Sequence, residues 1–371
     1  MKVALVASAV TPGSSSLERH VLALAHGLAE QGVEVELVTQ DTALRSARVV
    51  EENGLVVRRF PATSHGLRFA AAPGLREQIR QVAGSSDVIH IHASRGPLAA
   101  AAAGLISRRL VFTPHAPIQR LMRWPHAPGV RAVVDQAACI LPLSNVEADL
   151  ISEMFPHAAG RVWSVPPGVD GAAVEGARPL PYDGKVLLAS GGLDGEGRPE
   201  RVIAAMASLD EPFRLVVLAD RPAIRRLERY ADDLRVAERV VFIGRAAAAV
   251  RYRWLRTARV VVALREREPS GLELLEALSA GASVVACDSA VNREAARFTA
   301  GAGIEFVSPE SSPLELADAI AAAAERSVAP AARISIPSAR AVAEHTLSLY
   351  RSLSAAAVEP RGASANGRPA R

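Results

Sequence analysis

The sequence predicts an α/β protein made of two Rossmann-like, doubly wound domains with a ligand cleft at the carboxyl ends of the strands. A chain of 371 residues exceeds what one hydrophobic core usually organises, so two domains are expected. Apolar runs of strand length alternate with amphipathic helices in both halves of the chain, which favours parallel sheets covered by helices. Such folds bind ligands beyond the carboxyl ends of their strands, so functional residues are expected in the loops there.

The stretch 260–286 shows the repeating unit of this fold most clearly. It opens with five apolar residues in succession, which is typical of a parallel strand covered on both faces. Leucines then recur at helical spacing as far as Gly281, a residue suited to the left-handed position after a last helical turn. A second apolar strand follows. Glu268 lies in the loop after the first strand, and Glu276 lies in the helix.

The first half of the chain contains the same alternation. Strands are expected at 2–7, 33–39, 87–92 and 110–115, with an amphipathic helix at 17–31. Ser15 and Ser16 precede this helix, and a serine at a helix start commonly caps it. Further on, Ser144 and Glu147 have the three-residue spacing that predicts a capping box.

Three histidines lie within or at the end of predicted strands. His90 is expected to be buried and structural, because it lies within its strand. His92 ends that strand and is expected to face the cleft. His115 ends the next strand, where a lone histidine has either a structural, hydrogen-bonded role or a role in binding.

The segment 116–131 mixes apolar residues with arginines, including Arg120. One interpretation is a basic amphipathic surface that rests on an anionic membrane or grips a lipid-linked acceptor. The other is a helix that lines the cleft and packs into the core. The sequence leaves both open.

The second half of the chain begins after a proline-rich connection at 179–181. Strands are expected at 186–190, 214–218 and 239–244, and helices at 199–209 and 314–326. The predicted division is a first domain at 1–172, a linker at 173–184, a second domain at 185–337, a final helix at 338–356 and a disordered tail at 357–371.

Composition limits the possible functions. Cys139 and Cys287 are the only cysteines, so no disulfide framework is implied and a cytoplasmic location is expected. No signal peptide or bilayer-spanning run is evident. The turn at 7–13 lacks the three spaced glycines of nicotinamide-binding proteins, which counts against a dehydrogenase. The sequence shows no cluster of metal ligands, and we expect no metal, no cofactor and no nucleic-acid partner.

Taken together, these segments resemble the retaining GT-B glycosyltransferases of family four, which implies that the two Rossmann-like domains face each other across a cleft. The stretch 268–277, Glu-Pro-Ser-Gly-Leu-Glu-Leu-Leu-Glu-Ala, is similar to the donor-site signature of that family. The segments 18–21, 87–92, 113–115 and 165–170 are similar to other family motifs in the same order. The resemblance covers nearly the whole chain, from the N-terminus to about residue 353.

The resemblance implies an activity. Such an enzyme transfers a sugar from a nucleotide diphosphate to an acceptor hydroxyl with retention of configuration, in glycolipid, polysaccharide or cell-envelope synthesis. The nucleotide sugar is then a substrate, and the acceptor is a sugar, a lipid-linked molecule or a small molecule. Peripheral contact with the inner face of an anionic membrane is expected from the basic segment 116–131, and not from the resemblance. The final helix would cross back to the first domain.

The resemblance also implies which residues form the site. His115 and Glu268 would contact the donor sugar, and Glu276 would contact the ribose. A carboxylate can accept two hydrogen bonds from a vicinal diol, and the neighbouring helix start offers N–H groups to a diphosphate. The remaining donor-side residues are Gly191, Arg198, Arg267, Ser270, Gly271 and Leu272, and the acceptor-side residues are Ser15, Ser16 and Arg120.

One loop departs from the family pattern. Gly192 and Gly197 stand where the family has an arginine and a lysine that neutralise the donor diphosphate. We predict that Arg198 or Arg267 supplies the missing charge. A second hypothesis is a GT-B-like protein that binds a nucleotide sugar or a partner enzyme without turnover.

Overall fold

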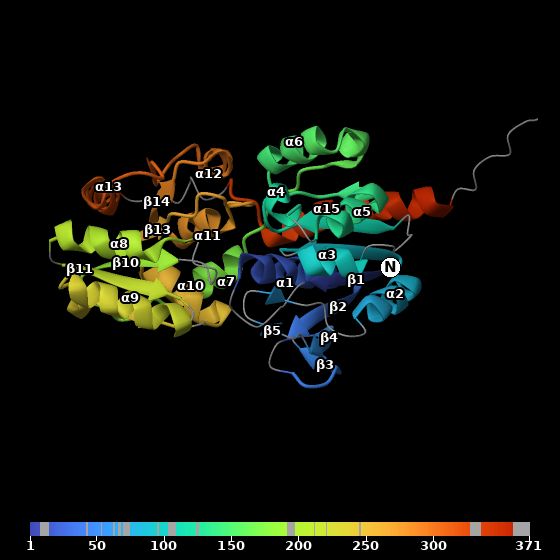
Figure 1. The fold of residues 1–371 in the computed structure, drawn as a ribbon, viewed down its shortest axis with the longest axis horizontal. Helices are drawn as coiled ribbons and strands as arrows, with labels where there is room; N and C mark the ends of the chain where they lie inside the picture. Colours follow the sequence, from blue (N-terminus) through green and yellow to red (C-terminus); the bar gives the residue numbers. More distant parts are fainter. Residues whose placement is uncertain are drawn as a thin grey trace, which may run out of the picture.

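Two largely parallel β-sheets, one in each half of the chain, form the framework of the computed structural model (Figure 1). The structure describes residues 1–7, 15–41, 44–52, 54–61, 64–65, 68–69, 75–94, 96–102, 109–123, 126–190, 197–210, 212–219, 221–244, 246–326 and 335–358. The prediction of an α/β protein with two Rossmann-like halves is confirmed. The two halves lie side by side in Figure 1.

The first sheet has seven strands in the order β3-β4-β2-β1-β7-β8-β9. Strand β3 is antiparallel to β4, and the other pairings are parallel. Buried aliphatic residues cover both faces, as the continuous apolar runs predict. The strands are β1 (Lys2–Ala7), β2 (Glu34–Asp41), β3 (Arg48–Glu52), β4 (Leu55–Pro61), β7 (Val88–Ala93), β8 (Leu110–Pro114) and β9 (Cys139–Ile140).

Helices and one small hairpin surround this sheet. Helix α1 ends at Ala29, two residues before the predicted end, and buries the aliphatic stripe that its sequence period predicts. The helices are α1 (Ser16–Ala29), α2 (Leu75–Ser85), α3 (Gly96–Ala102), α4 (Ile118–Leu121), α5 (Ala127–Gln136), α6 (Asn145–Met154) and the 3-10 helix η1 (Pro156–Arg161). The hairpin consists of β5 (Ser64–His65) and β6 (Arg68–Phe69).

The second sheet has six strands, all parallel, in the order β12-β11-β10-β13-β14-β15. They are β10 (Lys185–Ser190), β11 (Phe213–Leu218), β12 (Val240–Ile243), β13 (Val260–Ala263), β14 (Ser283–Cys287) and β15 (Ile304–Val307). The helices are α7 (Gly171–Gly176), α8 (Pro199–Ala205), α9 (Arg221–Asp233), α10 (Ala248–Thr257), α11 (Leu272–Ala280), α12 (Ala290–Ala296) and α13 (Pro313–Glu325). Short 3-10 helices are η2 (Met206–Ser208), η3 (Ala237–Arg239) and η4 (Arg297–Thr299).

The last helix, α15 (Ala339–Val358), returns to the first domain and packs along α1. Backbone bonds join the two ends of this crossing: Val169 N–H donates to Pro337 O, and Ala339 N–H donates to Val169 O. At Gly27 a Cβ atom would lie 2.6 Å from Ala343 Cβ, so glycine permits this close helix contact. The final helix therefore lies against the first domain.

Two predicted boundaries differ from the structure. Helix α7 occupies 171–176, so a short helix overlaps the start of the predicted linker. Helix α15 continues to Val358, into the predicted tail, and residues 359–371 lie outside the described part of the chain. Within that part, no helix combines the length and apolar character needed to span a membrane.

A buried chain of hydrogen bonds ties α15 to the first sheet. The Tyr350 hydroxyl lies 2.5 Å from His90 Nδ1, and His90 Nε2 lies 2.8 Å from Thr113 Oγ1. Thr113 donates its own proton to the Leu141 carbonyl, so it accepts from His90 Nε2–H. The neutral His90 ring then accepts at Nδ1 from Tyr350. The prediction that His90 is buried and structural is confirmed.

Replacement of Tyr350 by Phe is expected to lower the free energy of unfolding by about 1–3 kcal/mol, because His90 Nδ1 loses its donor inside the core. Urea unfolding followed by circular dichroism measures the change. Tyr230→Phe, on the solvent side of α9, is the matched control and should stay within about 0.5 kcal/mol of the parent. Equal stability of the two variants would show that the Tyr350 hydroxyl is not a donor to His90.

Candidate functional site

The loop between β13 and α11 holds the Glu268 carboxylate in a fixed position. Oε1 accepts hydrogen bonds from the Ser270 backbone N–H at 3.2 Å and from the Ser270 hydroxyl at 2.9 Å. Oε2 lies 3.4 Å from Arg265 Nε. The side chain is 8% exposed, and burial raises the pKa of Glu268 above its ordinary value. Its oxygens are therefore pre-oriented by residues of the same loop.

Gly271 lets the chain turn from this loop into α11. Its φ is +65°, and a Cβ atom there would lie 2.5 Å from Ala295 Cβ, so a side chain would meet both backbone strain and a clash. The hydroxyl of Ser270 accepts from Leu272 N–H at the helix start. The N–H groups of the next residues have no partner inside the helix by its geometry, and they supply positive potential at its N-terminus.

A cavity of about 10 Å³ lies between this loop and α11, with room for about one water molecule. Its lining comprises Ala263, Arg265, Glu268, Gly271, Glu273, Leu274 and Asn292. A larger ligand enters this cavity only if the surrounding side chains move.

Glu276, on α11, faces the first domain. Its Oε1 lies 2.6 Å from Arg19 Nε of α1, and its Oε2 lies 3.3 Å from Arg251 NH2 of α10. All three side chains are at least nine-tenths buried. Arg251 also lies 3.4 Å from Glu273 Oε1. The two domains therefore meet at a buried cluster of charges. This cluster contains Glu276, the residue that is predicted to bind the ribose.

A second contact between the domains lies at the start of α6. The Glu294 carboxylate of α12 accepts from the Asn145 and Val146 backbone N–H groups at 2.7 and 3.1 Å, and from the Asn145 side chain at 2.8 Å. A carboxylate at a helix N-terminus is stabilised by the helix dipole.

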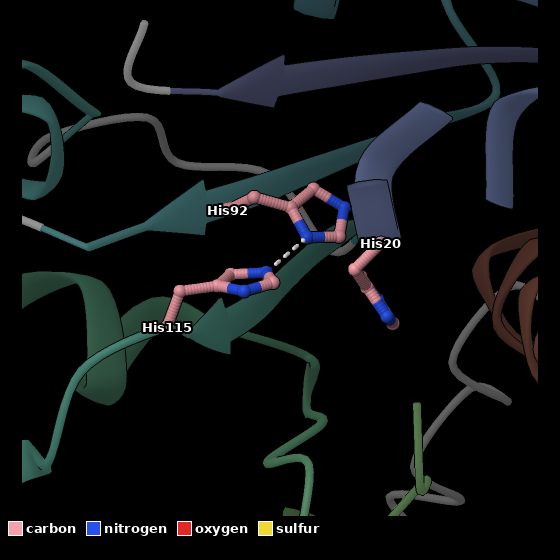
Figure 2. Close-up of side chains that lie close together, drawn as sticks. All are labelled: His20, His92 and His115. Carbon is pink, nitrogen blue, oxygen red and sulfur yellow. Dashed lines mark hydrogen bonds between the residues drawn. The ribbon is translucent and has the colours of Figure 1, made fainter. Parts of the chain in front are cut away.

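Three histidines from separate elements come together in the first domain (Figure 2). His20 lies on α1, His92 on β7, and His115 directly follows β8. His92 Nδ1 is 3.0 Å from His115 Nε2, and one nitrogen of each ring lies within 4.8 Å of the others. His92 Nε2 is buried and has no hydrogen-bond partner among the described residues.

The histidines are buried and neutral. Burial lowers the pKa of His20 to about 4 and lowers the pKa values of His92 and His115 well below the ordinary range. The sequence-based expectation that His92 faces an open cleft is wrong. Its side chain is 0% exposed, because α1 and the neighbouring strand cover the end of β7.

The other predicted site residues are helix-terminal, exposed or outside the described residues. Ser15 caps α1 by accepting from Glu18 N–H, and Ser16 is the first residue of that helix. Arg198, at the start of α8, has a left-handed backbone with φ +50° and is exposed, as is Arg267. Gly191 and Gly192 lie outside the described residues.

Arg201 is a further arginine near the predicted phosphate loop, and its side chain already has hydrogen-bond partners within the protein. Its NH2 donates to the Ser311 carbonyl and hydroxyl, both at 2.8 Å. Arg265 is similarly paired with Glu268. Arg198 and Arg267 therefore stay the arginines that we predict to contact a diphosphate.

Of the two interpretations of the segment 116–131, its described residues favour packing into the core. Ile118 and Leu121 of α4 are buried in the first core, while Arg120 is exposed. Trp124 lies outside the described residues.

The predicted capping box at α6 is half correct. Ser144 accepts from the Glu147 backbone N–H, as expected. The Glu147 carboxylate, however, accepts from the Ile118 N–H at 3.2 Å, so it links α6 to α4 and does not return to the cap residue. Burial raises the pKa of Glu147 to about 7.

This raised pKa predicts a pH dependence of stability. The folded pKa exceeds the ordinary value of 4.5, so the stabilisation from Glu147 is present below pH 4.5 and is lost as the pH rises through about 7. Glutamine does not ionise, so Glu147→Gln does not lose this stabilisation. Between pH 5 and pH 8 the free energy of unfolding of the variant should rise by about 2–3 kcal/mol relative to that of the parent. Urea unfolding at both pH values measures it, with exposed Glu153→Gln as the control. A pH-independent difference would contradict the prediction.

Sequence reasoning missed three residues at the site. It gave no role to Arg19, His20 or Arg251, although the first two lie in the segment 18–21 that matched a family motif. The helical period places His20 beside the buried stripe of α1, but it places Arg19 on the other face, and Arg251 lies on α10. The partners of these residues were not detectable, because the partners come from other elements of the chain.

Comparison with known proteins identifies relatives across both domains. Residues 17–172 match the model of Glycosyltransferase Family 4, and residues 175–336 match that of Glycosyl transferases group 1. The chain is 30% identical over 321 residues to D-inositol 3-phosphate glycosyltransferase from Actinosynnema mirum, covering 74% of this chain and 76% of that protein. It is 28% identical over 315 residues to phosphatidyl-myo-inositol mannosyltransferase from Propionibacterium freudenreichii, covering 78% and 77%.

Solved structures share the same overall fold. Sucrose-phosphate synthase from Thermosynechococcus elongatus superposes with a TM-score of 0.75 at 20% identity, covering 96% of this chain and 99% of that one. HepE from Anabaena, solved with UDP-glucose, superposes with a TM-score of 0.69 at 17% identity over 96% and 99% of the two chains.

Proposed function

Since this chain belongs to the family 4, group 1 glycosyltransferases and has their GT-B fold, we propose that it transfers a sugar from a nucleotide diphosphate to an acceptor hydroxyl with retention of configuration. One observation carries the proposal for the donor site. Glu268 precedes α11 beyond the carboxyl end of β13, and Glu276, in the second turn of α11, meets the opposite domain.

The proposed roles follow from the hydrogen-bonding capacity of each group. Ser270 uses two of the about four acceptor positions of the Glu268 carboxylate, both on Oε1, so Glu268 accepts from two sugar hydroxyls through Oε2 when the donor displaces Arg265 from that oxygen. Glu276 accepts from the ribose in the same way while it keeps Arg19. The N-terminus of α11 and an arginine stabilise the diphosphate.

We propose that sugar transfer occurs at the front face of the donor. The bond between the anomeric carbon and the leaving phosphate oxygen breaks as the bond to the acceptor oxygen forms on the same face. The acceptor proton passes to a phosphate oxygen. Catalysis then depends on positioning and on charge at the diphosphate, and the N–H groups of α11 lie fixed before the reaction.

We further propose a polyhydroxylated acceptor of the inositol phosphate type, free or as a lipid headgroup, in cell-envelope synthesis. Relatives named for inositol 3-phosphate and phosphatidylinositol support this class. Ser15, Ser16 and Arg120 stay the predicted acceptor-side residues, and contact with the inner membrane face stays a prediction.

Product formation with a panel of donors and acceptors tests the function. Uridine and guanosine diphosphate sugars are combined with inositol, inositol phosphate and phosphatidylinositol vesicles, and NMR of the product gives its anomeric configuration. Transfer with retention is expected for one pair. Nucleotide binding without product for any acceptor would favour a binding protein, which the glycines at 192 and 197 also suggest.

The missing phosphate-loop charges give a specific prediction. Arg198→Ala or Arg267→Ala should weaken binding of a nucleoside diphosphate by about 10-fold to 100-fold, since a hydrogen bond to a charged group contributes about 1.5–3 kcal/mol. Isothermal titration calorimetry measures the affinity, with exposed Arg340→Ala on α15 as the control. Unchanged affinity in both variants would remove these arginines from the donor site.

A further inference from the structure

The histidine cluster of His20, His92 and His115 has the geometry of a metal site. Tetrahedral coordination with metal–nitrogen bonds of about 2.0–2.1 Å places two ligand nitrogens about 3.3 Å apart. The nitrogens of His92 and His115 are already 3.0 Å apart, and the whole set lies within 4.8 Å. Small rotations of buried side chains therefore bring all three rings to bonding distance.

Hydrogen bonding leaves this cluster with unused capacity. Buried imidazole nitrogens normally have a partner, yet His92 Nε2 has none within the described ranges, while His92 Nδ1 is hydrogen-bonded to His115 Nε2. A metal ion at the cluster takes the place of the proton in that hydrogen bond, and the proton moves to the other nitrogen of its ring. All three residues are at least nine-tenths buried, and Figure 2 shows His92 and His115 joined by a hydrogen bond, with His20 of α1 beside them. Burial keeps the rings neutral, which is the form that binds metals.

The surroundings hold the ligands in place. His90 packs on His92 with the ring centres 3.9 Å apart, and the hydrogen bonds to Tyr350 and Thr113 fix the His90 ring. His92 therefore rests against a rigid neighbour, as metal ligands do when a second layer of residues orients them.

Although the sequence led us to expect no metal, the structure brings His20, His92 and His115 together, and we propose that they bind one divalent transition-metal ion of the Zn²⁺ type. Three imidazoles without a carboxylate favour zinc, cobalt, nickel or copper ions over magnesium and calcium, which prefer oxygen ligands. Three protein ligands leave a fourth position for water or for an oxygen of a bound molecule. The site neighbours the donor region, because Arg19, beside His20 in sequence, contacts Glu276.

The test uses the full chain without a histidine tag, stripped of metal by a chelator and titrated with Zn²⁺ and Co²⁺. We expect one equivalent of Zn²⁺ per chain and a Co²⁺ absorption spectrum of tetrahedral nitrogen coordination. His20→Gln and His115→Gln should each lower the affinity at least about 100-fold. His26→Gln, on the same helix as His20 but outside the cluster, should bind like the parent.

Circular dichroism and thermal unfolding without metal establish that each variant is folded. If one variant does not fold, the other variant and the Co²⁺ spectrum of the parent still show whether the cluster binds metal. Absence of stoichiometric binding to the parent would overturn the proposal, as would parent-like affinity in a folded His20→Gln or His115→Gln variant. Glycosyl transfer plays no part in these readouts, so a failure here leaves the proposed enzymatic function untouched.

Discussion

Glu268→Gln is expected to lower kcat/KM for sugar transfer by roughly 10²–10⁴-fold. The carboxylate is proposed to accept from two sugar hydroxyls, and each such bond contributes about 1.5–3 kcal/mol. Glutamine is nearly isosteric, and its carbonyl oxygen can still accept from the Ser270 N–H and hydroxyl. The variant therefore removes the charge while it keeps the loop, and initial rates over a range of nucleotide-sugar concentrations give kcat/KM.

A matched control lies two residues earlier in the same loop. Glu266 is exposed, so Glu266→Gln makes the same chemical change outside the cavity and should leave the rate unchanged. The thermal midpoint of Glu268→Gln should not fall by more than a few degrees, since burial already disfavours the charged form of Glu268. A parent-like rate in Glu268→Gln would exclude its proposed contact with the donor sugar.

Arg19→Met is expected to destabilise the protein by about 3 kcal/mol, the lower end of the range for a buried ion pair that loses one partner. The Glu276 side chain is 3% exposed, so its charge depends on Arg19 and Arg251 for compensation. Arg251 remains in the variant, which limits the loss. Chemical denaturation followed by tryptophan fluorescence measures the change.

A double-mutant cycle separates the pair from its surroundings. Because Glu276→Gln removes the uncompensated charge, Arg19→Met combined with Glu276→Gln should recover much of the stability lost in Arg19→Met alone. The exposed pair of Arg340 and Glu344 is the control, and Arg340→Met should change stability by less than about 1 kcal/mol. Additive effects of the two changes at Arg19 and Glu276 would contradict a direct interaction.

The ion pair of Arg19 and Glu276 also links the proposed donor site to the histidine cluster. Helix α1 carries Arg19 toward Glu276 and His20 toward the histidine cluster, so neighbouring residues of one helix contact both regions. Movement of the second domain relative to α1 would separate Glu276 from Arg19. Nucleotide affinity measured on Arg19→Met therefore reports whether the domain contact competes with the donor.

Local sequence patterns predicted the framework well, and particular elements show why. The five apolar residues at 260–264 correspond to β13 and its continuation, and Gly281 has the expected left-handed backbone, with φ +88°. Strand periods and glycine conformations depend on residues that are close in sequence. Glu147 shows the limit of this reasoning, because its spacing predicted a capping box while the tertiary fold offered the Ile118 N–H as a partner.

By itself, the sequence determined the alternation of strands and helices, the two Rossmann-like halves and the placement of Glu268 and Glu276 around the start of one helix. The tertiary structure alone decided which groups they meet: Glu276 pairs with Arg19, 257 residues away, and His20, His92 and His115 converge from three elements. The physical reason is that backbone periodicity is a local property. Pairing of buried charges and rings depends on how whole domains pack, and a single chain does not display that packing in its residue order.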